Sequence, residues 1–239
     1  MRPNFRSISG AALMLVIIPI FAGLLACMPV PIGDPESSRI DPDVTGVWIM
    51  DGDESSVAAY VFRPYDKRTW LLIGAEISPG EEFVGDELEI QSAQDAIIAL
   101  ETYSIGSEGL TSTSTIVYKA WLAKLGGEQF MTWEPVGGFN GDGSFTPEYW
   151  FVFKVHKTSD KQIELLMLNP EHDTFDDIVM PKDYEGDDYA RKMRRTWERA
   201  IKKAIDDPEL YGNPLVLQRL PVPLMDKASE LFQEVVEFE

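Results

Sequence analysis

Short runs of β-branched and aromatic residues, separated by turn residues, follow one another from residue 45 to residue 168. They predict strands at 45–51, 57–63, 69–77, 87–91, 97–104, 113–123, 128–134, 148–156 and 161–168. The connections are short, so we expect antiparallel neighbours, because parallel pairing needs a long crossover. The fold class is therefore mainly β, with an antiparallel meander that forms a barrel or a strongly curved sheet and protects its edges.

The turns between these runs have their own sequence signals. Gly126 and Gly127 predict a tight hairpin, because both glycines accept the positive φ of a primed turn. Residues 156–161 predict a second hairpin loop. The Gly-rich stretch 134–147 is long for a connection in a compact domain, and we expect it to be a loop at the mouth of the barrel.

The composition changes after residue 168. Residues 171–188 are strongly acidic, whereas 189–205 carry seven Lys or Arg residues against one Glu, with apolar residues at helical spacing. This pattern predicts an amphipathic helix with a basic outer face. Asp207 should then cap a second turn that begins with Pro208, and residues 223–237 predict a last helix. We therefore expect C-terminal α-helices over about 189–239.

The basic face of the first of these helices is the candidate binding surface. Its residues are Arg191, Lys192, Arg194, Arg195 and Lys202. In one interpretation the helix lies across acidic parts of the same chain and neutralises them. In the other it binds an acidic partner or an anionic lipid surface, to which each basic residue would contribute about 1 kcal/mol.

The first 27 residues have the layout of a bacterial export signal. Arg2 and Arg6 form a basic start, and residues 11–26 are mostly apolar but too short and too interrupted for a comfortable membrane span. The run ends in Leu24-Leu25-Ala26-Cys27, which resembles the lipobox of bacterial lipoproteins. The resemblance implies that residues 1–26 are a signal peptide and that Cys27, the only Cys, carries lipid. The alternative is an uncleaved anchor with an incidental Cys.

The residues after Cys27 bear on location and reach. The residue after Cys27 is Met28 and not Asp, which resembles the pattern of Gram-negative lipoproteins of the outer membrane. The resemblance implies a lipid-anchored protein of the bacterial cell envelope that faces the periplasm. Residues 27–43 contain four Pro, so we expect a tether that extends about 50 Å. Residues 44–239 then form a single β-rich domain.

A second resemblance lies at the start of the first predicted strand. Gly46-Val47-Trp48 resembles the G-x-W signature of lipocalins, a family of eight-stranded barrels followed by a helix. The family's T-D-Y motif is not found here, and Arg191 and Arg219 are the candidates for the Arg that covers the Trp. Residues 120–127 are similar to uncharacterised bacterial lipoproteins, a resemblance that carries no activity.

Composition and motifs narrow the function classes. A net charge of −19 argues against nucleic-acid binding, which needs a basic surface. The chain has no nucleophile elbow, zincin, Walker A or dinucleotide-binding motif, so we expect no enzyme and no cofactor. His172 with its neighbouring Asp residues, and the Asp- and Gly-rich stretches 51–55 and 140–144, match no metal site, and we expect no bound metal.

Two functions remain. The first is a membrane-anchored protein-interaction or scaffold module that binds another envelope protein. The second is a lipocalin-like carrier whose aromatic residues line a cavity for a small apolar ligand. They differ in whether the interior of the barrel is hollow or filled by side chains.

Overall fold

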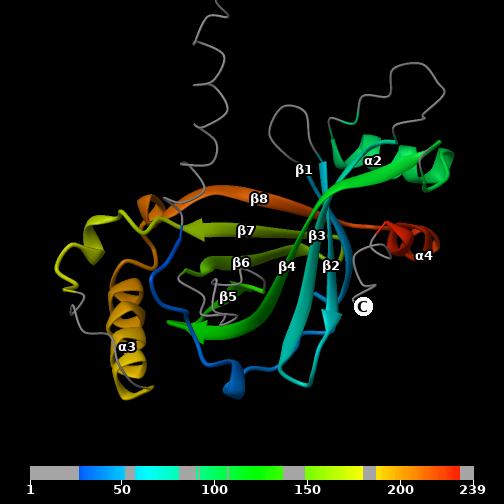
Figure 1. Ribbon diagram of the computed structural model, residues 1–239. Coiled ribbons are helices and arrows are strands. Elements are labelled where there is room, and N and C mark those ends of the chain that lie inside the picture. Colours follow the sequence, from blue (N-terminus) through cyan, green and yellow to red (C-terminus); the bar gives the residue numbers. More distant parts are fainter. Residues whose placement is uncertain are drawn as a thin grey trace, which may run out of the picture.

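The computed structural model describes residues 27–51, 57–80, 90, 92–106, 108–136, 149–179 and 187–231 (Figure 1). Its eight strands close into one barrel in chain order. The strands are β1 (Gly46–Asp51), β2 (Val57–Pro64), β3 (Thr69–Pro79), β4 (Leu110–Leu125), β5 (Glu128–Pro135), β6 (Phe151–Ser159), β7 (Gln162–Leu168) and β8 (Tyr211–Arg219). Every pair is antiparallel, including β1 with β8. The predicted fold class, a mainly β antiparallel barrel, is confirmed.

Side chains alternate between the interior and the outer surface of the barrel, because successive residues of a strand point to opposite faces. One buried cluster takes residues from all eight strands and is therefore the interior. Its largest members are aromatic and are listed here by strand: Trp48, Phe62, Trp70, Tyr118, Trp133 and Phe153. Two further clusters lie on the outer surface, where helices cover the strands.

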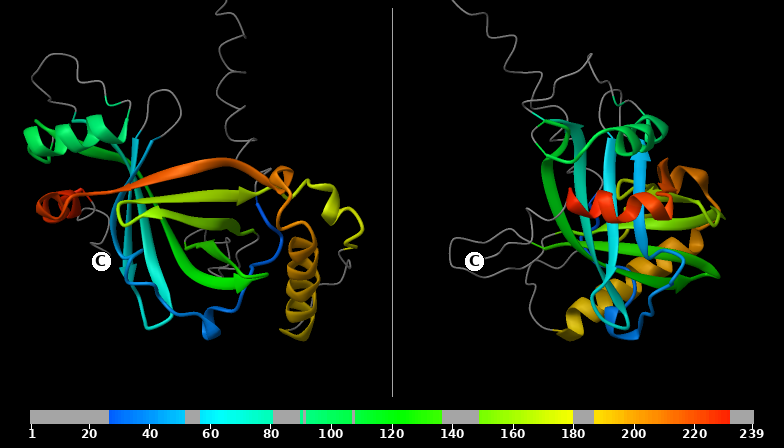
Figure 2. Two further views of the ribbon diagram at one scale, coloured as in Figure 1. Left: turned by 180° about the vertical axis from the view of Figure 1, so that it is seen from behind. Right: turned by 90° about the vertical axis from the view of Figure 1, so that its right-hand side faces the viewer.

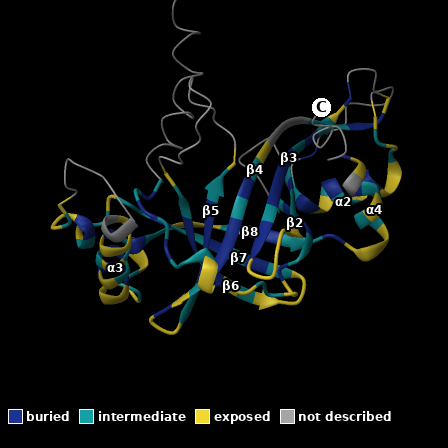
Figure 3. Cartoon of the chain, turned by 60° about the horizontal axis from the view of Figure 1, so that its bottom comes forward, coloured by how far each residue is buried: buried dark blue, intermediate teal, exposed yellow. Residues whose placement is uncertain are grey.

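Helices pack on two separate sides of the barrel (Figure 2). α2 (Ala93–Thr102) and α4 (Val222–Glu230) share a buried cluster with the outer faces of β1, β2 and β3. α3 (Asp187–Lys203) packs with outward residues of β5 and β6 and turns its basic side to solvent (Figure 3). Three short 3₁₀ turns, η1 (Pro35–Ser37), η2 (Asp173–Phe175) and η3 (Pro208–Leu210), complete the described elements.

Two strand assignments differ from the sequence prediction. The strand predicted at 97–104 is wrong, because these residues belong mainly to α2, which the Ser92 side chain caps by accepting from the Asp95 N–H at 3.2 Å. β8, in turn, was not predicted. It follows α3 and closes the barrel against β1 and β7. Of the strand predicted at 87–91, only Ile90 is described.

The turn and helix signals fared better. Gly126 and Gly127 take φ values of 61° and 95° in the β4–β5 hairpin, and Asp207 caps η3 with Pro208 at its first position. The helix predicted at 189–205 is α3. The helix predicted at 223–237 corresponds to α4, although residues from 232 onward lie outside the described part, as does most of the predicted mouth loop 134–147.

Residues 27–38 differ from the extended tether that their prolines predict. Met28, Val30 and Ile32 are each at most 1% exposed. The prolines hold the chain extended, so these alternate apolar residues all point to one side, onto β5, β6 and α3. The backbone N–H and C=O of Met28 also bond to Trp150, at 2.7 and 3.0 Å. We call residues 27–38 the N-terminal strap.

The strap is held along its length by further hydrogen bonds. The Ile32 C=O accepts from Trp121 Nε1 at 3.0 Å and from Thr132 Oγ1 at 2.9 Å. The Ser38 hydroxyl donates to the Leu122 C=O at 2.8 Å and accepts from its N–H at 3.1 Å. Leu122 lies just beyond the last residue of β4 that pairs with β3. The Ser38 hydroxyl therefore forms the hydrogen bonds to the Leu122 N–H and C=O that β3 does not form.

At the end of the barrel where β8 stops, Arg219 covers Trp48. Its guanidinium lies 4.8 Å from the centre of the Trp48 ring. It also donates to the C=O groups of Asp43 and Thr45, the latter at 3.0 Å. Of the two candidates, Arg191 and Arg219, the structure therefore places Arg219 over the Trp of the G-x-W motif, whereas Arg191 lies on α3.

Candidate functional site

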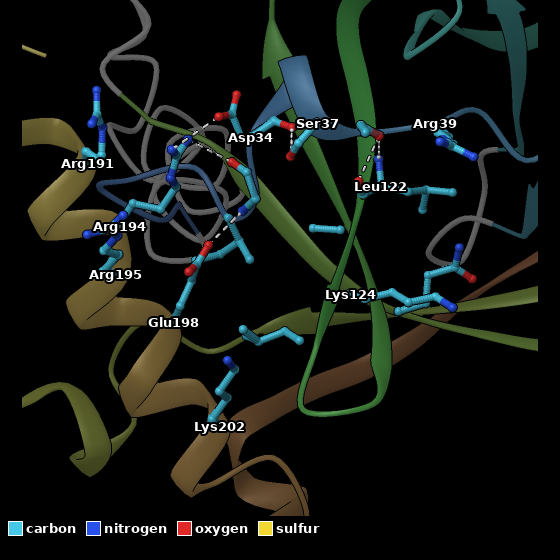
Figure 4. Close-up of a pocket in the computed structure, with 16 residues that line it drawn as sticks. Asp34, Ser37, Arg39, Leu122, Lys124, Arg191, Arg194, Arg195, Glu198 and Lys202 are labelled. Atoms are coloured by element: carbon cyan, nitrogen blue, oxygen red, sulfur yellow. Dashed lines mark hydrogen bonds and ion pairs between the residues drawn. The ribbon is translucent and has the colours of Figure 1, made fainter.

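A cavity of about 750 Å³ lies on the outer surface between α3, the N-terminal strap and the β4–β5 hairpin (Figure 4). We call it the basic groove. Six basic residues line it: Arg39, Lys124, Arg191, Arg194, Arg195 and Lys202. The acidic lining residues are Asp34 and Glu198. The groove is thus a concentration of positive charge on a chain whose net charge is −19.

Both acidic residues of the groove are occupied by structural contacts. Glu198 Oε1 accepts from the Gly33 N–H at 3.1 Å, and Arg194 donates to the Gly33 C=O at 3.0 Å. Arg194 also lies 3.6 Å from the Asp34 carboxylate. One turn of α3 therefore holds the main chain of Gly33 from both sides, and Arg194 and Glu198 form the floor of the groove.

Gly33 is required where α3 meets the barrel. Its φ is +74°, and a Cβ built on it would lie 2.3 Å from the Cβ of Ala123. Any side chain here would push the strap away from β4. The close approach brings the strap, α3 and the hairpin together and so forms the groove.

Four of the basic residues that line the groove are available to a ligand. Arg39, Lys124, Arg195 and Lys202 are exposed, and among the described residues none of these four makes an ion pair. They come from three segments, and in Figure 4 they lie on both sides of the opening. An anionic group placed between them would meet several cations at once, which strengthens each interaction relative to a single exposed pair.

The structure brings together four of the five residues predicted for binding. Arg191, Arg194, Arg195 and Lys202 line the groove, whereas Lys192 is exposed on α3 outside it. Sequence reasoning missed Arg39 and Lys124, which are isolated basic residues in a proline-rich stretch and near a hairpin. No local signal marks them, because only the tertiary fold places them opposite α3.

Cys27, the predicted lipidation site, begins the strap. It is half-buried and forms no disulfide, and burial raises the pKa of its thiol. The antiparallel bridge between Met28 and Trp150 places it beside Phe151 at the start of β6. Cys27 therefore lies at the end of the barrel where β5 ends and β6 begins, which we call the mouth. It is at the other end of the strap from Ser38.

Aromatic rings lie close together in the described interior of the barrel. The Trp133 ring centre lies 5.4 Å from that of Tyr60, 5.5 Å from that of Tyr118 and 4.5 Å from that of Phe153. Burial raises the pKa of the Tyr60 and Tyr118 hydroxyls. The basic groove and a second cavity of about 480 Å³, beside Lys154 and Asp207, both lie outside the barrel.

His172, which was weighed for metal binding, has a structural role. His172 Nδ1 accepts from the Thr174 N–H at 3.2 Å and so caps η2, and its Nε2 lies 3.4 Å from Asp207. Within the described ranges, no group of three or more His, Cys, Asp or Glu residues is placed to hold a metal ion. Residues 140–144 and most of 51–55 lie outside these ranges.

Comparisons with family models, with curated proteins and with solved structures find no match to this chain. Among the described helices, none is both long enough and apolar enough to span a bilayer.

Proposed function

We propose that the protein is a bacterial lipoprotein, anchored in the outer membrane by lipid on Cys27 and facing the periplasm, and that it acts as a protein-interaction or scaffold module. The docking site is the basic groove, and its occupant is an acidic segment of another envelope protein. The observation that carries the proposal is the set of exposed cations from three segments around one cavity. We propose no catalytic role and no cofactor.

Charge favours a specific acidic ligand over general adhesion. The protein as a whole is negatively charged and repels anions. An acidic partner is therefore attracted electrostatically at the groove and repelled by the rest of the surface. Arg194 and Glu198 already hold Gly33, which keeps α3 and the strap in place before any ligand binds. A preformed site of this kind binds with a smaller entropic cost than one that must order on binding.

The test uses a short poly-glutamate peptide as a defined probe. Its affinity is measured by calorimetry at low and at physiological salt, with a poly-lysine peptide for comparison. The variant Arg195→Glu/Lys202→Glu should weaken binding at least about tenfold, because each exposed pair contributes about 0.2–1 kcal/mol and reversal adds repulsion. Arg194 is left unchanged because it holds Gly33.

The matched control is Lys192→Glu/Lys203→Glu. These two exposed residues lie on the same helix but do not line the groove, so their reversal changes the net charge without touching the site. Binding that falls equally in both variants, or that is unchanged by the groove variant at low salt, contradicts the proposal. In cells, a photo-crosslinking residue at Lys124 should capture an envelope protein whose crosslinked segment is acidic.

A second candidate, the lipocalin-like carrier, draws support from the closed eight-stranded barrel and from Arg219 over Trp48. This candidate has less support than the first, because the rings packed around Trp133 occupy part of the interior in which a ligand would bind. Native mass spectrometry of protein purified from membranes tests it. A small apolar molecule bound at unit stoichiometry, and lost on Trp133→Arg, would favour the carrier.

A further inference from the structure

We propose that the mouth of the barrel lies against the lipid bilayer, so that the basic groove is held away from the membrane and open to the periplasm. This inference rests on the proposed lipid at Cys27 and extends it, because it assigns the face of the domain that contacts lipid. The face is defined by three exposed apolar residues, Ile116, Val136 and Tyr149, which we call the mouth rim.

The rim residues are neighbours at one end of the barrel. The Val136 N–H bonds to the C=O of Val117, next to Ile116, at 2.8 Å. The Tyr149 ring lies 5.8 Å from that of Phe151, which lies 5.9 Å from Tyr118, two residues along β4 from Ile116. Large apolar side chains exposed together at one site are typical of a surface that contacts a partner or a membrane.

These side chains are exposed to a degree that needs an explanation. Ile116 is 52% exposed, Val136 is 46% exposed and Tyr149 is 37% exposed. Tyrosine is enriched at the boundary between lipid and water, because its ring is apolar and its hydroxyl is polar.

Cys27 lies beside this rim. The Met28–Trp150 bridge sets Cys27 next to Phe151, the residue that links Tyr149 to Tyr118. Cys27 and Tyr118 are close enough to interact electrostatically: burial is the main cause of the raised Tyr118 pKa, and Tyr60, Tyr149 and Cys27 add to it. Acyl chains on Cys27 would therefore leave the protein at the mouth of the barrel.

No flexible linker separates the proposed lipid on Cys27 from the folded domain, because the strap is packed from Met28 onward. Met28 is fully buried and bonded through both backbone groups, and consecutive Cα atoms are about 3.8 Å apart. A bilayer that holds acyl chains on Cys27 must then come within a residue's length of the rim. Gly33, where the groove begins, lies six residues further along the extended strap, about 20 Å away along the chain.

The experiment measures which face meets the membrane. The lipidated mature protein is reconstituted in neutral phosphatidylcholine vesicles, with one introduced cysteine labelled by an environment-sensitive fluorophore. Cys27 is the only native cysteine and acylation consumes its thiol, so the label reports a single position. The rim variants are Ile116→Cys and Val136→Cys. The controls are Tyr65→Cys, which is 71% exposed in the turn between β2 and β3, and Arg195→Cys in the groove.

We expect a blue-shifted emission and severalfold stronger quenching by lipid-borne quenchers at both rim positions than at either control. Rim labels that are as accessible to water as Tyr65→Cys, on protein whose Cys27 is acylated by mass, overturn this inference and leave the lipid anchor standing. Quenching at Arg195→Cys instead of at the rim also overturns it. Protein without added cysteine that takes the label shows an unacylated Cys27, which overturns the lipid anchor and the orientation together.

Discussion

The guanidinium of Arg219 lies 4.8 Å from the ring of Trp48, across the pairing of β8 with β1 that closes the barrel. The same guanidinium donates to the C=O groups of Asp43 and Thr45, and thereby ties the end of the last strand to the chain that enters the first one. A single planar side chain thus closes one end of the barrel through hydrogen bonds and a cation–π contact.

Arg219→Ala should lower the free energy of unfolding by about 2–4 kcal/mol, because two C=O groups lose a charged donor and Trp48 loses its covering group. Arg219→Lys should recover less than half of that loss, because an ammonium lacks the planar fork. Urea denaturation measures both. Arg68→Ala, which removes an exposed pair with Glu36, is the control and should change stability by less than about 1 kcal/mol. An equal effect at Arg68 and Arg219 would remove the special role of Arg219.

Gly33→Ala should destabilise the protein by about 2–3 kcal/mol, because the new Cβ would meet that of Ala123 and the φ of +74° strains any side chain. The comparison is Gly127→Ala, whose φ is +95° with nothing within 4 Å, so it reports the backbone strain alone. Thermal unfolding of both, and of Gly33→Ala/Ala123→Gly, completes the set. The destabilisation of Gly33→Ala that exceeds that of Gly127→Ala should disappear in the double variant. If it does not, steric contact with Ala123 is not the cause.

Ile32→Ala should cost about 2–4 kcal/mol, because the Ile32 side chain is fully buried between α3 and the barrel. A mobile tether would instead show no change in stability. The exposed strap residue Glu36, changed to Ala, is the control on the same segment. Denaturation together with limited proteolysis of the strap distinguishes the two cases, since a packed strap resists cleavage until the domain unfolds.

The ion pair of Lys157 with Asp43 should make stability depend on pH at both extremes. The hydrogen bond from Lys157 Nζ, at 2.7 Å, holds the pKa of Asp43 below its usual range, and it raises the pKa of Lys157. Since Asp titrates at about 3.9 when unfolded, its contribution is present above that pH and is lost as pH falls through the lowered folded value.

The Lys157 contribution has the opposite sign. It is present below the unfolded pKa of about 10.4 and is lost as pH rises through the raised folded value. Lys157→Met should therefore make the melting temperature depend less on pH at both extremes, whereas Lys161→Met, in the turn of the same β6–β7 hairpin, should not. An NMR titration of Asp43 that gives an ordinary pKa in the native protein would contradict the pair.

Local patterns predicted the elements whose signals are local. The Gly126–Gly127 turn, the Asp207–Pro208 cap and the amphipathic helix α3 depend on contacts within a few residues, and the structure contains all of them. The segment 97–104 was wrongly predicted to be a strand, because its apolar residues are compatible with either a strand or a helix. There the Ser92 cap and the small residues Ala96 and Ala99, which let α2 approach the barrel, decided for helix.

The candidate site could be predicted only in part for the same reason. The basic residues of α3 were visible as a periodic pattern, whereas Arg39 and Lys124 join them only through folding. Nothing local distinguishes Arg194, which holds Gly33, from Arg195, which is exposed to ligands.

By itself, then, the sequence determined the antiparallel β class, the basic helix and the single Cys with its preceding apolar run. These follow from composition and short-range periodicity. Only the tertiary structure decided that β8 closes the barrel, that Arg219 covers Trp48 and that the strap lies packed against the barrel. Each of those contacts joins residues far apart in the chain, and its free energy comes from burying surfaces that exist only once the barrel has formed.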